Sequence, residues 1–149
     1  MSELRELYQE LIIDHGRSPR NFGKLDTANH IKEGYNPLCG DKITIYLQTE
    51  NGIVTDVKFE GEGCAISMAS ASLMTQVLKG KSVDDVQALF RHFHTLVTDT
   101  DEKEGHEALG KLKVLQGVAE FPARVKCATL CWHTIVAALK NDDQPVSTE

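Results

Sequence analysis

The fold of this chain is decided by the segment ITIYLQTENGIVTDVKF, residues 43–59. Apolar side chains alternate with more polar ones along residues 43–48 and again along residues 53–60. This two-residue period is typical of a strand with one buried face. Asn51-Gly52 lies between the two runs and favours the tight turn of a β-hairpin. The sequence therefore predicts two antiparallel strands joined by a short turn.

Candidate metal ligands lie at the two open ends of this hairpin. Cys39 and Asp41 come just before the first strand, and Cys64 comes just after the second. Gly40 can adopt backbone angles closed to other residues, so the turn can direct both neighbouring side chains inward. Because the open ends of two antiparallel strands meet, we expect these three side chains to come together. Taken alone, each short motif is also compatible with a plain turn.

Helical spacing of apolar residues dominates the rest of the chain. Most of these segments show one apolar stripe, whereas the helix that follows Cys64 is apolar nearly all round and is expected to be buried. Pro122 is expected to break the chain before the last helix. We expect a short strand at residues 30–34 and helices over residues 3–15, 65–79, 111–118 and 125–140, with a further helix after a capping box formed by Ser82 and Asp85.

Two cysteines belong to these helices in a way that bears on their chemistry. Cys64 precedes the helix over residues 65–79, where free amides and the helix dipole favour a thiolate. Cys127 and Cys131 share the apolar stripe of the last helix. The acidic residues 98–110 are interpreted as an exposed loop with a short helical turn, and residues 141–149 as a frayed polar tail.

The composition is that of an ordinary globular protein. The chain has 149 residues, of which 41% are hydrophobic and 26% charged, and this length predicts a single domain over residues 1–149. The net charge of -6 argues against a nucleic-acid partner, which requires a basic face. No apolar run approaches the roughly 20 residues of a membrane span, and the N-terminus lacks the pattern of a signal peptide. We therefore expect a cytoplasmic protein with no membrane partner.

The chain has four cysteines. Because structural disulfides are uncommon in the cytoplasm, cysteines there favour metal binding or thiol chemistry. They do not form Cys-x-x-Cys pairs, so the fold has to assemble any metal site from distant segments. Scattered core cysteines are the alternative, because a free cysteine is among the most buried residue types. For Cys131 we favour this alternative, with a spare or resolving thiol as the second interpretation.

The candidate donor set combines three thiolates with one carboxylate: Cys39, Cys64, Cys127 and Asp41. Four such donors suit a tetrahedral zinc ion, and thiolates also suit iron or an iron–sulfur cluster. A purely structural zinc site usually contains only Cys and His, and an aspartate is a harder, more easily displaced ligand. Three basic residues lie close in sequence to these donors: Lys42 follows Asp41, and Arg124 and Lys126 precede Cys127. They are candidates to offset the negative charge of the site or to bind an acidic partner.

Three motifs in the same order resemble the signatures of the IscU/SufU family, which serves iron–sulfur cluster assembly. The resemblance covers nearly the whole chain and implies an α+β fold, an antiparallel three-stranded sheet with helices packed on it. The motifs are Asn36-Pro37-x-Cys39-Gly40-Asp41, Gly61-x-Gly63-Cys64-x-Ile66-Ser67-x-Ala69-Ser70 and Lys126-Cys127-Ala128-x-Leu130-x-Trp132.

The SufU type is the closer of the two. Lys126 stands where IscU-type scaffolds carry a histidine, and the segment over residues 115–124 is longer. Resemblance to SufU implies a zinc-bound sulfur acceptor that works with a cysteine desulfurase of the SufS type rather than a stand-alone enzyme. It makes Cys39 the persulfide acceptor, while Asp41, Cys64 and Cys127 hold zinc and a desulfurase histidine displaces Asp41.

Other functions remain open from the sequence. The same four residues would serve a scaffold on which an iron–sulfur cluster is built and passed to downstream assembly proteins. A zinc ion that only holds the fold together is a third interpretation. A thiol hydrolase or redox enzyme is a fourth, although the sequence shows no Cys-x-x-Cys motif to support it. His92, His94 and Trp132 are interpreted as ordinary helix and packing residues.

Overall fold

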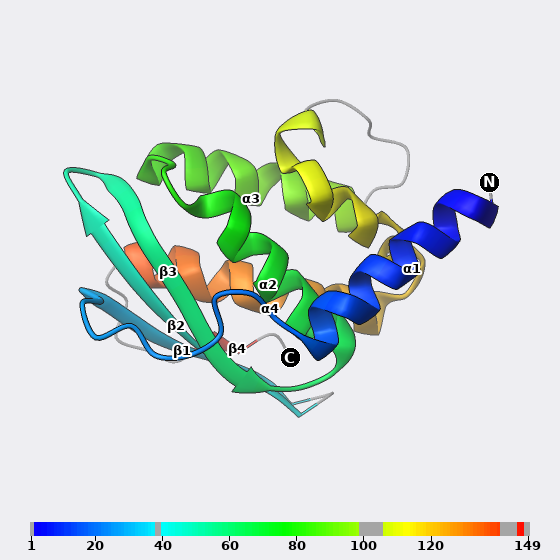
Figure 1. The fold of residues 1–149 in the computed structure, drawn as a ribbon, viewed down its shortest axis with the longest axis horizontal. Coiled ribbons are helices and arrows are strands. Elements are labelled where there is room, and N and C mark those ends of the chain that lie inside the picture. Colours follow the sequence, from blue (N-terminus) through cyan, green and yellow to red (C-terminus); the bar gives the residue numbers. More distant parts are fainter. Residues whose placement is uncertain (1, 38–39, 99–105, 141–145, 148–149) are drawn as a thin grey trace.

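The predicted hairpin lies at the centre of a sheet. The computed structural model describes residues 2–37, 40–98, 106–140 and 146–147. In it β2 (Asp41–Glu50) and β3 (Ile53–Glu62) pair antiparallel, and β1 (His30–Asn36) pairs antiparallel with the other edge of β2. The turn residues Asn51 and Gly52 have φ angles of 52° and 77°, as the favoured two-residue hairpin turn requires. The prediction of a three-stranded antiparallel sheet is confirmed (Figure 1).

A fourth strand extends the sheet beyond this prediction. β4 (Val146–Ser147) pairs parallel with Gly34 and Tyr35 of β1, which gives the strand order β3-β2-β1-β4. These two residues were expected within a frayed tail, and that expectation is wrong for them because they pair with the free edge of β1. Residues 141–145 and 148–149 of the expected tail lie outside the described residues.

Within the described residues five helical segments accompany the sheet, and α2 is largely enclosed by other elements. It packs against β3, α1, α4 and η1, and its residues from Ser67 to Thr75 are all buried. The expectation of a buried helix after Cys64 is therefore confirmed. The segments are α1 (Ser2–Arg17), α2 (Ala65–Leu78), α3 (Val83–Thr98), the 3-10 helix η1 (His106–Glu120) and α4 (Pro122–Leu139).

The helices cover one face of the sheet. Along β2 every second side chain from Asp41 to Leu47 is buried, while the side chains between them remain at least partly exposed. α4 packs against β1 and β2 and α2 packs against β3, with α1, α3 and η1 further out (Figure 1). The core between these layers is apolar, and its largest fully buried side chains include Trp132, Phe59 and Phe93.

Trp132 has the packing role that the sequence suggests. Its ring is fully buried and stacks on Phe93 at 5.1 Å between ring centroids. Phe90 stacks on the same indole at 6.4 Å and also meets the His133 ring edge-on at 5.1 Å. These aromatic contacts join α3 to α4, so they hold the helix that carries Cys127 in place.

The starts of α4 and η1 differ most from the expected helix boundaries. α4 begins at Pro122 rather than at residue 125, because proline is well suited to the first position of a helix and interrupts only its interior. The prediction that Pro122 breaks the chain before the helix is thus wrong. η1 begins at His106, five residues before the expected start, and contains a kink at Gly110, whose φ is 56°. Ser82 does cap α3, since its hydroxyl accepts a hydrogen bond from the Asp85 amide at 3.1 Å.

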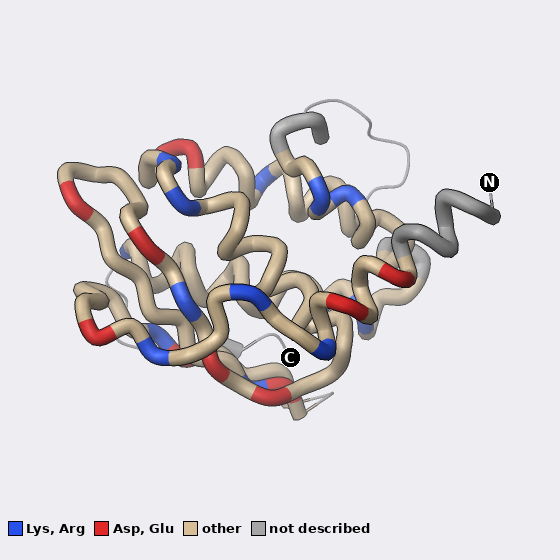
Figure 2. Tube along the Cα trace, viewed as in Figure 1, with Lys and Arg blue, Asp and Glu red and all other residues tan. Residues whose placement is uncertain are grey.

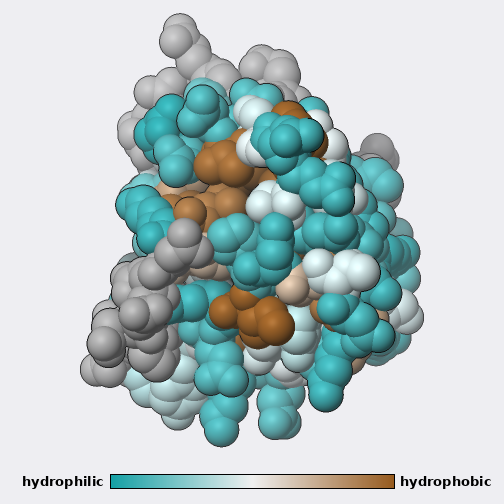
Figure 3. Space-filling model, turned by 90° about the vertical axis from the view of Figure 1, so that its left-hand side faces the viewer, coloured by the Kyte–Doolittle hydropathy of each residue, from teal (hydrophilic) through white to brown (hydrophobic). Residues whose placement is uncertain are grey.

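The described surface is mixed in character. Lys and Arg alternate with Asp and Glu over helices and strands (Figure 2). The face drawn in Figure 3 is mostly hydrophilic, with apolar residues showing in small separate areas. Within the parts of the chain that the structure describes, no helix combines the length and apolar character needed to cross a bilayer.

A buried histidine joins α1 to α2. His15 is 2% exposed, and its Nδ1 lies 2.7 Å from the Ser72 hydroxyl of α2. The same hydroxyl accepts a hydrogen bond from the Arg20 amide at 2.8 Å, so it can donate its own proton to a neutral His15. Burial, with the positive charge of Arg20 as a second cause, lowers the pKa of His15 below its usual 6.5.

This lowered pKa makes stability depend on pH. The unfolded chain binds a proton at His15 more readily than the folded chain, so the free energy of unfolding falls as pH drops below about 6.5. His15→Gln keeps a polar group beside Ser72 and should reduce this loss. Urea unfolding at pH 7.5, 6.5 and 5.5, at fixed metal content, measures it. His133→Gln is the control, because partial burial also lowers the pKa of His133. Equal pH slopes in wild type and His15→Gln would contradict the account.

Candidate metal centre

Three donor side chains from separate elements converge at one end of the sheet. Asp41 is the first residue of β2, Cys64 caps the N-terminus of α2, and Cys127 lies in the second turn of α4. Their ligand atoms all lie within 4.8 Å of one another. Asp41 and Cys127 are 0% and 2% exposed, and Cys64 is half-buried. Cys39, the remaining predicted ligand, lies outside the described residues.

Asp41 is held by the backbone at the other end of the hairpin. The Cys64 amide donates a hydrogen bond to Asp41 Oδ1 at 2.8 Å, while Oδ2 lies 3.9 Å from Cys64 Sγ. Lys42 pairs with Glu62 across the sheet, so the register of β2 and β3 brings Asp41 beside Gly63. The predicted meeting of the hairpin ends is therefore confirmed for Asp41 and Cys64.

Cys64 occupies the capping position of α2. Its backbone is extended, with φ -70° and ψ 165°, and its sulfur accepts a hydrogen bond from the Ser67 amide at 3.4 Å. A sulfur that takes the place of a capping oxygen faces the free amides and the positive end of the helix dipole. The sulfur that caps α2 is thus the same atom that Cys64 presents to Asp41 and Cys127.

Cys127 receives a hydrogen-bond donor from β1. The Asn36 side-chain amide lies 3.5 Å from Cys127 Sγ, and Asn36 itself is fully buried. The sequence indicates only a turn at Asn36 and does not predict the contact of its side chain with Cys127. The only signal for it was its place in the first of the three motifs, because a contact between β1 and α4 is not visible in local sequence.

Comparison with known proteins agrees with this geometry. Residues 7–128 match the family described as the NifU-like N-terminal domain. The chain belongs to this family. It is similar to the zinc-dependent sulfurtransferase SufU of Bacillus subtilis strain 168, with 40% identity over 95% of each chain. It is also 42% identical to the iron–sulfur cluster assembly scaffold protein IscU of Thermotoga maritima, over 93% of this chain and 96% of that one.

A solved structure shares the family fold. The crystal structure of a putative iron–sulfur cluster assembly scaffold protein for the SUF system from Fervidobacterium islandicum AW-1 superposes with a TM-score of 0.82. The two chains are 32% identical, and the match covers 91% of this chain and 98% of that one. The α+β fold and the IscU/SufU resemblance inferred from three motifs are both confirmed.

Cys131 lies in the core and is not one of the three converging donors. It is 1% exposed, and its sulfur lies 3.5 Å from the Ser70 hydroxyl, which itself donates to the Ala128 carbonyl at 2.6 Å. Burial raises the pKa of the Cys131 thiol to about 12. It therefore stays a neutral thiol at ordinary pH, and the expectation of a buried core cysteine is confirmed.

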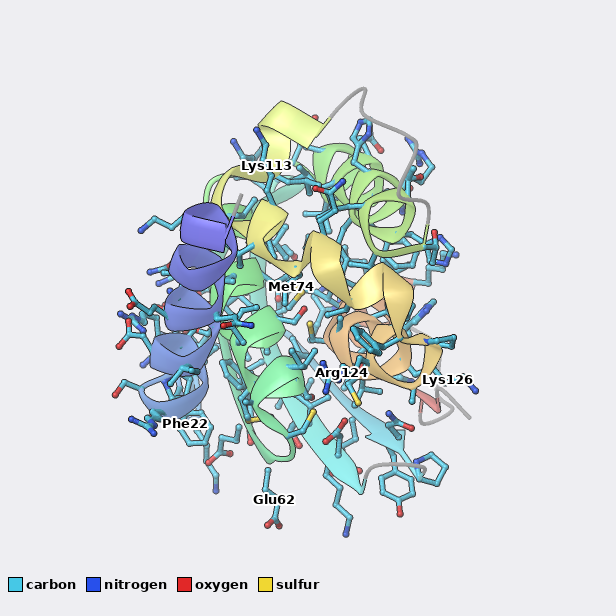
Figure 4. All side chains as sticks on the ribbon, turned by 90° about the vertical axis from the view of Figure 1, so that its right-hand side faces the viewer. Phe22, Glu62, Met74, Lys113, Arg124 and Lys126 are labelled. Atoms are coloured by element: carbon cyan, nitrogen blue, oxygen red, sulfur yellow. The ribbon has the colours of Figure 1, made fainter. Side chains whose placement is uncertain are left out.

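Positive side chains lie toward the same end of the molecule. Figure 4 shows Arg124 and Lys126 in the half of the view that holds Glu62, with Lys113 at the opposite end. Arg124 lies 4.6 Å from the centre of the Phe121 ring, a cation–π contact. Among the described residues, no Lys or Arg forms an ion pair with Asp41. The buried carboxylate therefore relies on the Cys64 amide and on any cation held by the donors.

The described donors fit a small thiophilic cation. Zinc bonds of about 2.0–2.3 Å in a tetrahedron place neighbouring donors roughly 3.5–3.8 Å apart. Asp41 Oδ2 and Cys64 Sγ, at 3.9 Å, lie close to that separation. A buried carboxylate beside two sulfurs that must ionise to act as ligands is costly without a cation. Asp41, Cys64 and Cys127 would hold the ion, with one further donor to complete four.

A separate groove plays no part in this site. It has a volume of about 600 Å³ and lies between α1 and η1. None of the converging donors lines it. The residues that line it are Glu10, Leu11, Asp14, Gly110, Lys111, Lys113 and Val114.

The division between donor and core cysteines is testable by metal content. Cys131→Ala should keep the wild-type zinc content, because this thiol lies outside the converging group of described donors. Cys64→Ala and Cys127→Ala should each lose most of the zinc, since each removes one of the donors and leaves the tetrahedral set incomplete. Elemental analysis after gel filtration measures zinc per chain, and circular dichroism checks the fold. Zinc loss in Cys131→Ala with the fold intact would contradict this assignment.

Proposed function

We propose that this protein is an iron–sulfur cluster assembly protein that accepts persulfide sulfur on Cys39, beside a zinc ion held by Asp41, Cys64 and Cys127. The observation that carries the proposal is the convergence of three donors from β2, α2 and α4 within 4.8 Å. The 40% identity to the zinc-dependent sulfurtransferase SufU of Bacillus subtilis over 95% of each chain supports it.

Cys39 is the sulfur acceptor in this proposal because of its place in the chain. It lies between Asn36 and Asp41, which are direct partners in the pairing of β1 with β2. Since Cys39 is two residues before Asp41, covalent geometry limits the separation of their Cα atoms to about 7.6 Å. The described residues Asn36 and Asp41, before and after Cys39 in the sequence, both lie at the donor cluster.

The transfer is a thiol exchange with the partner's persulfide. The Cys39 thiolate attacks the outer sulfur of a cysteine desulfurase persulfide and forms a new sulfur–sulfur bond. The bond inside the desulfurase persulfide breaks, and its thiolate is released. The sulfur moves with no net oxidation or reduction. Zinc, when bound, supplies a positive charge that favours the thiolate form of neighbouring cysteines.

The partner in this proposal is a cysteine desulfurase of the SufS type, and the downstream recipients are proteins of iron–sulfur assembly. The protein acts with its partner in the cytoplasm rather than as a stand-alone enzyme. A single domain over residues 1–149 is sufficient for this role. Arg124 and Lys126 are positioned toward the donor end, where they would favour an acidic partner surface.

A desulfurase assay tests the acceptor role. A SufS-type desulfurase supplied with cysteine should turn over faster when the wild-type protein is added, as alanine release measures. Cys39→Ala should return the rate to that of the desulfurase alone, because the persulfide then has no acceptor thiol. Cys131→Ala is the matched control and should stimulate like wild type. Full stimulation by Cys39→Ala would favour a purely structural zinc ion.

A scaffold for iron–sulfur clusters is the second candidate. The 42% identity to the scaffold protein IscU of Thermotoga maritima favours it, and two thiolates with a carboxylate also suit cluster iron. Lys126 stands directly before Cys127, where IscU-type scaffolds carry a histidine, and this departure favours the zinc-dependent role.

Metal analysis separates the two roles. Protein purified without added metal and under argon should contain close to one zinc per chain and little acid-labile sulfide. Zinc should be lost on treatment with a strong chelator, and the desulfurase stimulation should fall with it. Iron and sulfide in matching amounts, together with visible charge-transfer absorption, would instead favour the scaffold.

A further inference from the structure

The Gly63 backbone lies against the Asp41 side chain more closely than any other residue type would allow. A Cβ atom built on Gly63 would collide with Oδ1 of Asp41 and lie 2.9 Å from its Cγ. Gly63 is not among the described glycines with positive φ. The backbone there is therefore open to an L side chain, and the obstacle to one is the carboxyl group of Asp41.

The next residue uses this close approach to bind the carboxylate. Cys64 N donates to Asp41 Oδ1 at 2.8 Å, a distance that a methyl group on Gly63 would increase by pushing the side chain away. The two oxygens of Asp41 are thus unequal. Oδ1 is engaged by the amide, and Oδ2 is the oxygen that approaches Cys64 Sγ.

From this inequality we propose that Gly63 and the Cys64 amide are positioning elements that make Asp41 a one-oxygen donor, held in the site even when it does not bind the ion. The inference rests on the proposed function, because it concerns the zinc centre. A buried carboxylate that leaves a cation needs another partner for its charge. The Cys64 amide supplies that partner without any movement of the backbone.

This arrangement has a consequence for exchange at the site. With Oδ1 already hydrogen-bonded to the Cys64 amide, binding of the ion through both oxygens would compete with that hydrogen bond. A carboxylate that binds through one oxygen and keeps its second partner is displaced at lower cost than one that binds through two. Gly63 would thus help to determine how readily the oxygen donor leaves and returns.

Gly61 provides a matched control two residues away. It also leaves no room for a side chain, but its Cβ would collide with the Lys42 carbonyl and lie 2.9 Å from Ile43 Cα. Its φ of 152° adds a backbone reason for glycine. The three atoms nearest to a Cβ on Gly61 thus belong to the backbone of Lys42 and Ile43, whereas those nearest to a Cβ on Gly63 belong to the Asp41 side chain.

The test is a double-mutant cycle between Gly63 and Asp41. Zinc affinity is measured by chelator competition for wild type, Gly63→Ala, Asp41→Ala and the double variant. Gly63→Ala alone should lower affinity by about 10- to 100-fold, as changes around metal ligands do. In the Asp41→Ala background the same substitution should change affinity by less than about twofold, because the carboxylate it displaces is gone. Gly61→Ala should have the same effect in both backgrounds.

Two further readouts are independent of desulfurase activity. The visible spectrum of the cobalt-substituted protein should change on Gly63→Ala toward that of Asp41→Ala, because both variants remove the oxygen donor. Thermal unfolding of metal-free protein should show that Gly63→Ala is destabilising only when Asp41 is present. If Gly63→Ala alone fails to fold, recovery of folding in the double variant supports the inference.

The results that overturn the inference differ from those that overturn the proposed function. Equal effects of Gly63→Ala with and without Asp41, a wild-type cobalt spectrum in Gly63→Ala, or a double variant as unfolded as Gly63→Ala would each overturn the positioning role. A wild-type protein that binds neither zinc nor cobalt would overturn the proposed function. The metal-free unfolding cycle would still decide whether Gly63 and Asp41 are coupled.

Discussion

The hydrogen bond from the Cys64 amide to Asp41 joins the two open ends of the central hairpin, and the donor cluster depends on it. It requires the register in which Asn36 pairs with Asp41 on one side of β2 and Lys42 pairs with Glu62 on the other. A shift of one residue would turn every side chain of β2 to the opposite face. Asp41 would then point away from α2 and α4, so sheet pairing and metal binding impose the same constraint.

Local sequence patterns were sufficient for the hairpin and for the approach of Asp41 to Cys64. The alternation of apolar and polar residues predicts the two strands, and the Asn-Gly turn predicts that they pair antiparallel. In such a hairpin the two open ends meet, so Asp41 and Cys64 are expected to lie close together. The position of Cys127 beside these two residues could not be predicted from local patterns, because the packing of α4 on the sheet depends on contacts between distant segments. Cys127 was a candidate donor as a cysteine of a chain expected in the cytoplasm and through the resemblance to known motifs, and the structure shows that it joins Asp41 and Cys64. Cys39 stays a prediction.

The features that sequence reasoning missed share one physical origin. Asn36 contacts Cys127 of α4, the Gly63 backbone lies against the Asp41 side chain, and β4 pairs with a strand far away in sequence. None of these leaves a periodic signal. The early start of α4 is different, because Pro122 was read as a helix breaker when its fixed φ also makes it a favourable first residue.

Position along α4 explains why two cysteines one turn apart differ in chemistry. Cys127 lies level with the open end of the sheet, where the Asn36 amide, Asp41 and Cys64 approach it. Cys131 lies one turn deeper, where Ser70 is its hydrogen-bond partner and burial favours the neutral thiol. The three converging donors are thus grouped at the end of the fold, whereas Cys131 lies within the core. A cation that binds there interacts with ionisable donors, while the core cysteine stays protonated.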